Sequence, residues 1–447
     1  MKKITVLFVI LSMAFLLAAC GGSAEPVEIP VETAVEPTLP PAPATATLLP
    51  PPVVSQSGGE GDTAVASEEP APPTPAPAIA EPQTLPVWPA DRFGYGVQVH
   101  GDATVSDQGT VMDVVKNQLG MDWVKTQIRW NYAEAGRDEY QWFFYDATLN
   151  EAAEKGLYTL VSVVAAPDWS RSYGLDQTGK HGPPDNYQDY YDFLRTLLER
   201  YPDKIDAVEV WNEQNLDREW LAPNGLSAAD YTAFLKGAYE TIKSVNPDVI
   251  VVSGALSPTG GWTEPDGTVT ALDDFVYLDQ MIQAGFLNYA DCVGVHHNGI
   301  NLPPDVAYDQ TGSLPESATA SFRGPFDNPH HSWSFKTTLD VTAEKVRAVD
   351  PNKKLCITEF GWATREGLAG DVGNFGFAND NTLDEQAQYI VQAFNQMRDS
   401  GYVWIATLFN FDFGNKGTDD PALYSLIDSS GIPRPAFGAV AAMEKDH

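Results

Sequence analysis

Short runs rich in β-branched and aromatic residues alternate with helical stretches from about residue 90 to the C-terminus, and this alternation restricts the possible folds. The strand-like runs are at 95–99, 123–128, 159–164, 207–210, 249–253, 292–295, 355–358 and 404–409. The stretches that follow them carry apolar residues at helical spacing. Eight strand–helix units predict an α/β fold, the (β/α)8 TIM barrel, rather than an open doubly wound sheet.

The N-terminus reads as a targeting segment. Residues 1–19, MKKITVLFVILSMAFLLAA, combine a lysine pair, an apolar run and small residues, which is typical of a secretory signal peptide. The quartet LAAC at 17–20 resembles a bacterial lipobox, and this resemblance implies cleavage before Cys20 and lipidation of its thiol. An ordinary signal peptide with an incidental Cys20 is the alternative.

Residues 20–87 form the second predicted segment. They are largely Pro, Ala, Thr, Glu and Val, with no Lys or Arg between Lys3 and Arg92, so we expect a disordered linker. It would tether a catalytic domain at 88–447, which we expect to be monomeric, to the outer side of the bacterial cell membrane. The formal net charge of −34 argues against a nucleic-acid partner.

The remaining cysteines and the histidines give little sign of a disulfide scaffold or a metal. Cys292 and Cys356 lie in apolar strand-like runs, where we expect buried free thiols, with a bridge between them as the alternative. His296 and His297 would point to opposite faces of a strand. His330 and His331 lie in a long loop without an evident third ligand. We therefore expect no cofactor and no metal.

Two glutamates stand at predicted strand ends. Glu213 follows the fourth run in VEVWNEQN, and Glu359 ends the seventh in LCITEFGWAT. Barrel enzymes build their active sites at the carboxyl ends of the strands, so both side chains should meet at one mouth. Either residue alone would more often be a strand-end cap or a surface ion pair. Together they form the carboxylate pair that cleavage of a glycosidic bond requires.

These motifs resemble those of glycoside hydrolase clan A, the retaining (β/α)8 enzymes, and in particular its cellulase-like and xylosidase/iduronidase-like families. The resemblance covers about residues 91–437. It implies a retaining O-glycosyl hydrolase with Glu213 as acid/base and Glu359 as nucleophile. It also implies that Asn212 binds the sugar 2-hydroxyl and that Arg129, in QIRW, keeps Glu359 ionised.

One position departs from the clan's pattern. In GVHHNG, His296 matches the clan's histidine, but Asn298 stands where a tyrosine usually hydrogen-bonds the nucleophile. We therefore keep two alternatives to a hydrolase: a non-catalytic surface glycan-binding protein with a degenerate site, and a transglycosylase that uses the same residues. The motifs do not distinguish a glucan, xylan, mannan or galactan substrate, nor endo from exo action.

Aromatic residues beyond the strand ends are candidates for stacking on sugar rings, with core packing as the alternative for each. They are Trp169, Trp220, Trp262, Trp362 and Phe409, of which Trp169 and Trp362 are the better placed. Long loops at 170–184, 258–273 and 300–333 are predicted to wall the same rim. For a retaining enzyme the two carboxyl groups should be roughly 5–5.5 Å apart. The pKa of Glu213 should be raised, and that of Glu359 lowered by Arg129.

Overall fold

The computed structural model describes residues 85–446, apart from 102–106, 178, 314–329 and 414–419. The predicted signal peptide, the lipidated Cys20 and nearly all of the 20–87 linker therefore lie outside the described residues. Among the helices of the described part, none has the length and apolar character needed to cross a bilayer.

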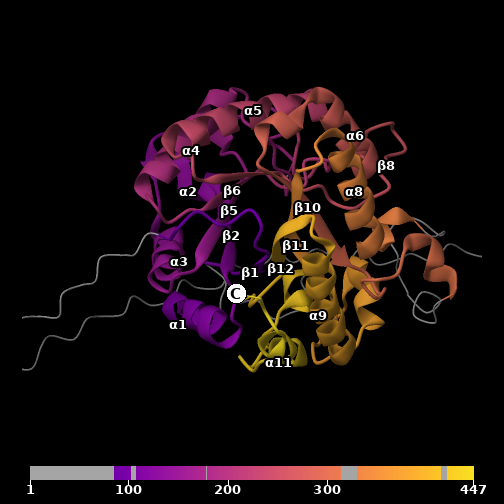
Figure 1. The fold of residues 1–447 in the computed structure, drawn as a ribbon. Helices are drawn as coiled ribbons and strands as arrows, with labels where there is room; N and C mark the ends of the chain where they lie inside the picture. Colours follow the sequence, from indigo (N-terminus) through magenta and orange to yellow (C-terminus); the bar gives the residue numbers. More distant parts are fainter. Residues whose placement is uncertain (1–84, 102–106, 178, 314–329, 414–419, 447) are drawn as a thin grey trace, which may run out of the picture. The chain divides into compact units, whose positions relative to one another are not determined.

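A closed barrel of parallel strands forms the centre of the fold (Figure 1). Its strands are β1 (Gly94–Gln98), β2 (Trp123–Arg129), β5 (Tyr158–Val164), β6 (Ala207–Val210), β7 (Ile250–Ser253), β10 (Cys292–Gly299), β11 (Lys354–Trp362) and β12 (Val403–Leu408). They follow one another around the barrel in chain order, and β12 closes it by pairing with β1. The predicted (β/α)8 fold and all eight predicted strands are confirmed.

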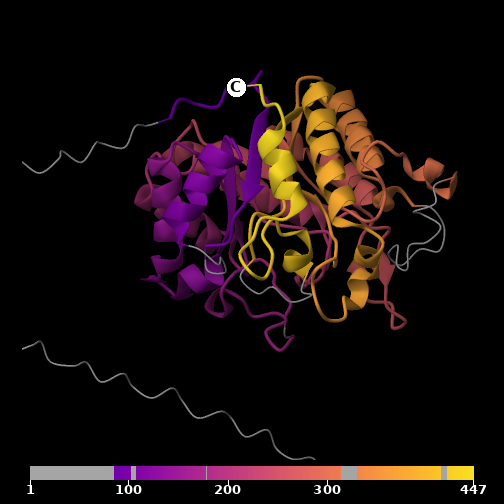
Figure 2. The same ribbon diagram turned by 90° about the horizontal axis from the view of Figure 1, so that it is seen from below.

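Helices surround the barrel, as Figure 1 shows. They are α1 (Gln108–Asp113), α2 (Trp130–Ala133), α3 (Phe143–Glu154), α4 (Tyr187–Arg200), α5 (Ala228–Val245), α6 (Asp274–Ala284), α8 (Phe335–Val349), α9 (Leu383–Ser400), α10 (Asp420–Tyr424) and α11 (Pro435–Ala442). A π-helical stretch, η1 (Val114–Gln118), continues α1, and short 3-10 turns occur at η2 (Asp168–Ser170), η3 (Phe286–Tyr289), η4 (Tyr308–Ser313), η5 (His331–Trp333) and η6 (Gly373–Asn379). Figure 2 shows α11, in yellow, beside α9.

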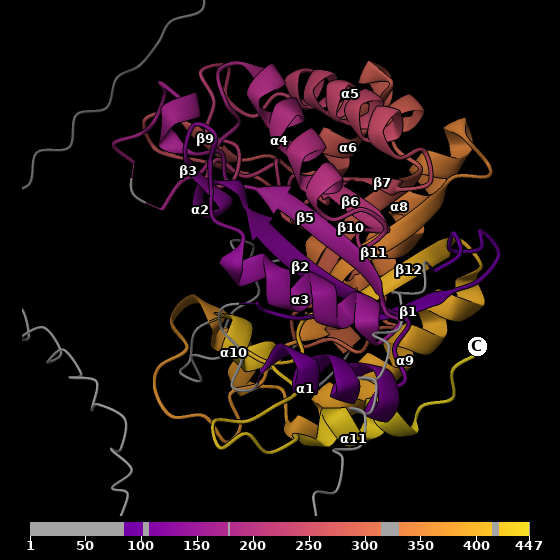
Figure 3. The same ribbon diagram turned by 90° about the vertical axis from the view of Figure 1, so that its left-hand side faces the viewer.

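Two small hairpins stand in the loops that follow barrel strands. One pairs β3 (Glu134–Gly136) with β4 (Glu139–Tyr140), and the other pairs β8 (Trp262–Thr263) with β9 (Val269–Ala271). In Figure 3, β3 and β9 lie beyond the same end of the barrel. This end carries the C-termini of the strands, and the predicted rim loop at 258–273 therefore contains a hairpin of its own.

Strand alternation separates two apolar layers. On β6, Val208 and Val210 face outward and pack with the helices, whereas Ala207 belongs to the barrel interior. Trp88 closes the interior at the other end of the barrel by packing edge-on against Trp123 and Tyr158, the first residues of β2 and β5. The carboxyl end of the barrel lies opposite this plug.

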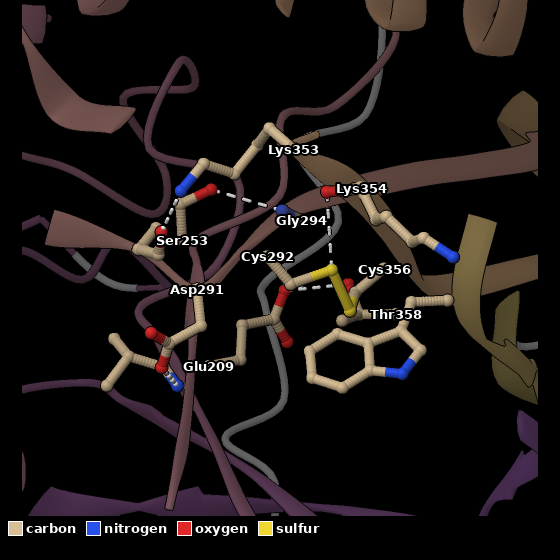
Figure 4. The surroundings of a disulfide bond; sticks show 12 residues. Glu209, Ser253, Asp291, Cys292, Gly294, Lys353, Lys354, Cys356 and Thr358 are labelled. Atoms are coloured by element: carbon tan, nitrogen blue, oxygen red, sulfur yellow. Dashed lines mark hydrogen bonds between the residues drawn. A yellow bond between two sulfur atoms is a disulfide. The ribbon is translucent and has the colours of Figure 1, made fainter. Parts of the chain in front are cut away.

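Cys292 and Cys356 form a disulfide, so the expectation of free thiols was wrong. They lie on the adjacent strands β10 and β11, both in the interior cluster, with Cα atoms 5.8 Å apart, which is within the range that a disulfide spans. Figure 4 shows the bridge close to Glu209 and Thr358. The sequence left this open because a strand register cannot be read from two isolated cysteines.

Candidate active site

The stretch VEVWNEQN turns sharply where β6 ends. Trp211 and Glu213 have φ of 78° and 44°, a left-handed conformation that costs non-glycine residues about 1–3 kcal/mol each. Neighbouring contacts hold this turn in place: Glu213 N donates to Ala255 O at 2.8 Å, and Gln214 Nε2 donates to Gly254 O at 2.8 Å. Asn215 bonds Ser257 in both directions. The loop after β7 therefore fixes the direction of the Glu213 side chain.

A β-bulge aims Glu359 into the barrel. Val295 of β10 pairs with Ile357, but His296 pairs with Glu359, so Thr358 is an extra residue in β11. Thr358 faces inward and bonds Glu209, and the shift of one residue turns Glu359 inward as well. Without the bulge, alternation would direct Glu359 toward the helices.

Glu213 and Glu359 meet at His296, which also points inward from β10. Its Nδ1 lies 3.2 Å from Glu213 Oε1 and 3.9 Å from Glu359 Oε2. The two carboxylates are therefore separated by no more than the sum of these distances. Their predicted convergence at the mouth agrees with this geometry, and the value of roughly 5–5.5 Å stays a prediction.

The cation that contacts Glu359 is Lys125, on β2, whereas Arg129 was predicted for this position. Its Nζ lies 2.9 Å from Glu359 Oε1 and 3.3 Å from Glu209 Oε2, and its side chain is fully buried. Glu209 in turn accepts hydrogen bonds from Thr358 Oγ1 at 2.7 Å, from Ala255 N at 3.2 Å and from Ser162 Oγ. Arg129 instead has its Nη2 2.8 Å from His181 Nε2 and forms no ion pair with a carboxylate in the described chain.

The pKa of Glu213 is lowered, whereas the sequence predicted that it would be raised. Burial alone would raise the pKa of Glu213, but the hydrogen bond from His296 and the charge of Arg218 outweigh it and lower that pKa to about 2. Burial would lower the pKa of His296, yet the carboxylates of Glu359 and Glu213 raise it. The lowered pKa of Glu213 favours its ionised form, and the raised pKa of His296 favours the protonated imidazole.

A further acidic residue, Glu219, lies near Glu213, and Arg218 contacts both of them. Arg218 Nη2 lies 2.8 Å from Glu213 Oε2, and its Nε lies 3.7 Å from Glu219 Oε1. Burial and the charge of Glu213 raise the pKa of Glu219 to about 7, against the opposing effect of Arg218 and Arg129. The Arg218 side chain is 58% exposed, so it is the outermost member of this group.

Several predicted binding residues keep unused hydrogen-bonding atoms. Among the described residues, Asn212 Oδ1, Asn298 Oδ1 and Arg129 Nε have no partner although they are buried. Asn298 follows His296 on the inward face of β10, where it pairs in register with Gly361. Buried polar atoms are rarely left unpaired, so these three are suited to bind a ligand's hydroxyl groups.

The aromatic residues that were predicted to stack on sugar rings are mostly occupied by contacts within the protein. Trp362 is fully buried, faces outward from β11 and packs against Phe335 and Tyr389, so its assignment to sugar stacking was wrong. Trp169 has Arg137 over its ring at 4.2 Å. Phe409 is 7% exposed and contacts Tyr424.

Trp262, on the β8 hairpin of the rim, is 49% exposed. Of the tryptophans beyond strand ends that the structure describes, it has the most accessible ring. An exposed hairpin position was not apparent from the sequence, because neither strand of this hairpin exceeds three residues.

Four residues of this group were not predicted from the sequence, namely Lys125, Glu209, Arg218 and Glu219. For the first two a signal existed: WVKTQIR and AVEV each carry a charge inside a strand-like run, at a position that alternation places inside the barrel. Arg218 and Glu219 lie in a loop, where charged residues are common, and no pattern in the sequence marked them.

Comparisons with known proteins define the fold. No protein-family model matches the chain, and no curated protein matches it. A family 39 glycoside hydrolase from Bacteroides cellulosilyticus WH2 is similar in structure, with a TM-score of 0.55, 20% identity and coverage of 79% of this chain. The match spans 64% of that protein's chain.

GH5_18 from Streptomyces cattleya, solved in complex with GlcNAc, has a TM-score of 0.51 and 17% identity, covering 78% of each chain. The β-glycosidase BGL167 has a TM-score of 0.50 and 14% identity, over 80% of this chain and 96% of that one. The structural neighbours of this chain are thus glycoside hydrolases, and its fold is the (β/α)8 barrel that the resemblance to clan A implied.

Proposed function

We propose that this protein is a retaining O-glycosyl hydrolase that cleaves glycosidic bonds in poly- or oligosaccharides by double displacement. The observation that carries this proposal is the meeting of Glu213 and Glu359 at His296, 3.2 and 3.9 Å from its Nδ1, in the mouth of the barrel. The barrel shared with glycoside hydrolases supports it further.

In the first step, Glu359 attacks the anomeric carbon. Lys125 binds Oε1, which leaves Oε2 as the attacking atom. The bond to the leaving oxygen breaks, and Glu213 donates a proton to that oxygen. In the second step Glu213 takes a proton from water, the hydroxide attacks the same carbon, and the ester to Glu359 breaks with net retention of configuration.

The acid role of Glu213 requires that it gain a proton when substrate binds. Arg218 is the group most easily displaced by an entering sugar, because its side chain is 58% exposed. Loss of this cation removes one of the two groups that lower the pKa of Glu213, so that this pKa rises. The proton on His296 Nδ1 then crosses the 3.2 Å contact to Glu213 Oε1.

The remaining groups position the sugar. Asn212 and Asn298 offer their unpartnered side-chain oxygens to hydroxyl groups, and Arg129 offers Nε. Trp262 provides an exposed ring on the rim hairpin. A carbohydrate is therefore the proposed partner of this mouth.

We place the enzyme outside the cytoplasm, anchored through Cys20 and held off the membrane by the 20–87 linker. The disulfide between Cys292 and Cys356 supports this, because such bridges persist in oxidising compartments. In membrane fractions, Cys20→Ser should release the protein into the soluble fraction, whereas retention would count against a lipid anchor.

The test is hydrolysis of a panel of polysaccharides and aryl glycosides, including N-acetylglucosaminides because one structural neighbour was solved with GlcNAc. Glu213→Gln should lower kcat by roughly 10²–10⁴-fold on substrates with poor leaving groups. On substrates whose leaving group needs no proton, it should spare the first step and slow only hydrolysis of the glycosyl-enzyme, because that step still needs Glu213 as base. Glu359→Gln should lose turnover on both kinds.

Azide distinguishes the two roles. This test uses Glu213→Ala and Glu359→Ala, because azide must occupy the space of the lost carboxylate. In Glu213→Ala it should restore turnover and give a glycosyl azide of retained configuration, whereas in Glu359→Ala the product should be inverted. A Lys236→Met variant, altered in an exposed ion pair of α5, is the matched control for handling. If no substrate turns over and all variants bind glycans alike, the protein is a glycan-binding protein. Transfer to a sugar acceptor would identify a transglycosylase.

A further inference from the structure

A cluster of metal-ligating side chains lies outside the barrel, between the start of α6 and the segment before α8. Asp273 is the N-cap of α6, and His330 and His331 precede α8. His331 Nε2 lies 3.6 Å from Asp273 Oδ2, and His330 Nε2 lies 3.8 Å from the same oxygen. Asp273 is the third ligand that the sequence did not reveal for the histidine pair.

We propose that Asp273, His330 and His331 form a binding site for a divalent transition-metal ion, of which Zn²⁺ is the test case. Each contributes one ligand atom, and these atoms lie within 4.8 Å of one another. Around a tetrahedral Zn²⁺ with bonds of about 2.0–2.1 Å, neighbouring ligand atoms are about 3.3 Å apart. Side-chain shifts of a few tenths of an ångström would bring the distances of 3.6 and 3.8 Å to that value.

Neighbouring contacts already orient the three ligands. Asp273 Oδ1 accepts the Val276 N–H at 3.0 Å, so Oδ2 is the oxygen left to face the histidines. The ring of His331 stacks on Phe275, with centroids 4.0 Å apart. Metal ligands are commonly held by such outer contacts.

Two adjustments accompany metal binding. His330 Nδ1 accepts the Ser332 N–H at 3.3 Å in the metal-free protein. With metal on Nε2 the proton moves to Nδ1, which can donate to Ser332 Oγ, 3.0 Å away. His331 Nε2 exchanges its 2.8 Å contact with Asp274 Oδ1 for the metal. Asp274 Oδ1 keeps its bond from Thr259 N at 3.0 Å. The fourth position of a tetrahedral ion is then left to a water molecule.

The donor set selects the metal. Two imidazoles with carboxylate oxygens favour Zn²⁺ and its transition-metal neighbours over Ca²⁺ and Mg²⁺, which prefer oxygen donors. All ligands come from the rim outside the barrel, and none belongs to the group around His296. The metal would fasten the segment before α8 to the start of α6. This proposal does not depend on the glycosidase assignment.

Calorimetric titration of Zn²⁺ into the EDTA-stripped full-length protein tests the site. We expect one ion per chain, bound in the micromolar range or tighter. His331→Gln and Asp273→Asn should each weaken binding at least roughly 30-fold, in keeping with the tenfold or greater losses seen even for outer-contact changes. Asparagine still caps a helix, so Asp273→Asn should leave the fold intact. Asp266→Asn, on the neighbouring hairpin loop, is the matched control and should bind as the wild type does.

A second readout is independent of calorimetry. Saturating Zn²⁺ should raise the unfolding temperature of the wild-type protein and of Asp266→Asn, but not that of the two ligand variants, because only a bound ion stabilises the folded state. Circular dichroism in EDTA verifies that each variant folds. Absence of stoichiometric binding by the wild type, or equal binding by all variants, would overturn the proposal.

Discussion

Replacing Lys125 by methionine removes the cation that two buried carboxylates share. Its Nζ is 2.9 Å from Glu359 Oε1 and 3.3 Å from Glu209 Oε2. At an effective dielectric constant of about 20, each attraction is roughly 5 kcal/mol. The lysine's own desolvation offsets much of this, and removing one partner of a buried pair costs about 3–5 kcal/mol in practice. We expect the Lys125→Met protein to lose that amount of unfolding free energy near neutral pH.

The loss should depend on pH, with a defined sign. Burial alone would raise the pKa of Glu209, but the charges of Lys125 and His296 lower it. A lowered pKa contributes stability above the unfolded value of about 4.3, and this is lost as pH falls through the folded pKa. Without Lys125 the pKa of Glu209 rises, so its contribution is instead lost as pH rises. The deficit of the variant should therefore shrink toward pH 4 and be full near pH 7.5.

Urea unfolding at about pH 4.5 and about pH 7.5 measures this difference. Lys236→Met is the matched control, since its ion pair with Glu240 is exposed and should contribute little to stability at either pH. Adding Glu209→Gln to the Lys125 variant should restore part of the loss at the higher pH. A variant as stable as the wild type, or a deficit that is equal at both pH values, would refute the reasoning.

Three further perturbations have defined outcomes. Arg218→Ala should move the alkaline limb of kcat/KM upward by up to about one pH unit, because loss of an exposed cation lets the Glu213–His296 pair hold its shared proton to higher pH. A pH–rate profile measures this, and a downward shift would contradict it. Glu219, whose pKa is raised to about 7, contributes stability below its unfolded pKa that is lost as pH rises through 7. Urea unfolding at about pH 5 and about pH 8 should therefore show the wild type losing up to about 3 kcal/mol more than Glu219→Gln. Alanine at both Cys292 and Cys356, which are 64 residues apart, should lower the unfolding free energy by about 4 kcal/mol, and an unchanged urea midpoint would contradict this.

Features that depend on the local sequence could be predicted, whereas contacts between residues far apart in the chain could not. The strands and the positions of Glu213 and Glu359 could be predicted because periodicity and strand ends are local features, and the barrel rule places strand ends at one mouth. The partner of Glu359 could not, because Lys125 and Arg129 both face inward from β2, and only the three-dimensional packing decides which of them reaches the carboxylate. The disulfide and the Asp273 cluster were missed for the same reason, since each joins residues more than fifty positions apart.

The bulge at Thr358 changes the parity of β11. Before it, even-numbered residues such as Cys356 line the barrel and odd-numbered ones such as Ile357 pack with helices; beyond it, Glu359 faces inward and Phe360 and Trp362 face the helices. Deletion of this one residue would leave either half of the strand out of phase with its neighbours. The part of β11 before Thr358, with the disulfide, and the part after it, with Glu359, can therefore accept substitutions independently. The number of residues between Cys356 and Glu359 must stay the same, because one residue more or fewer would reverse which side chains face inward.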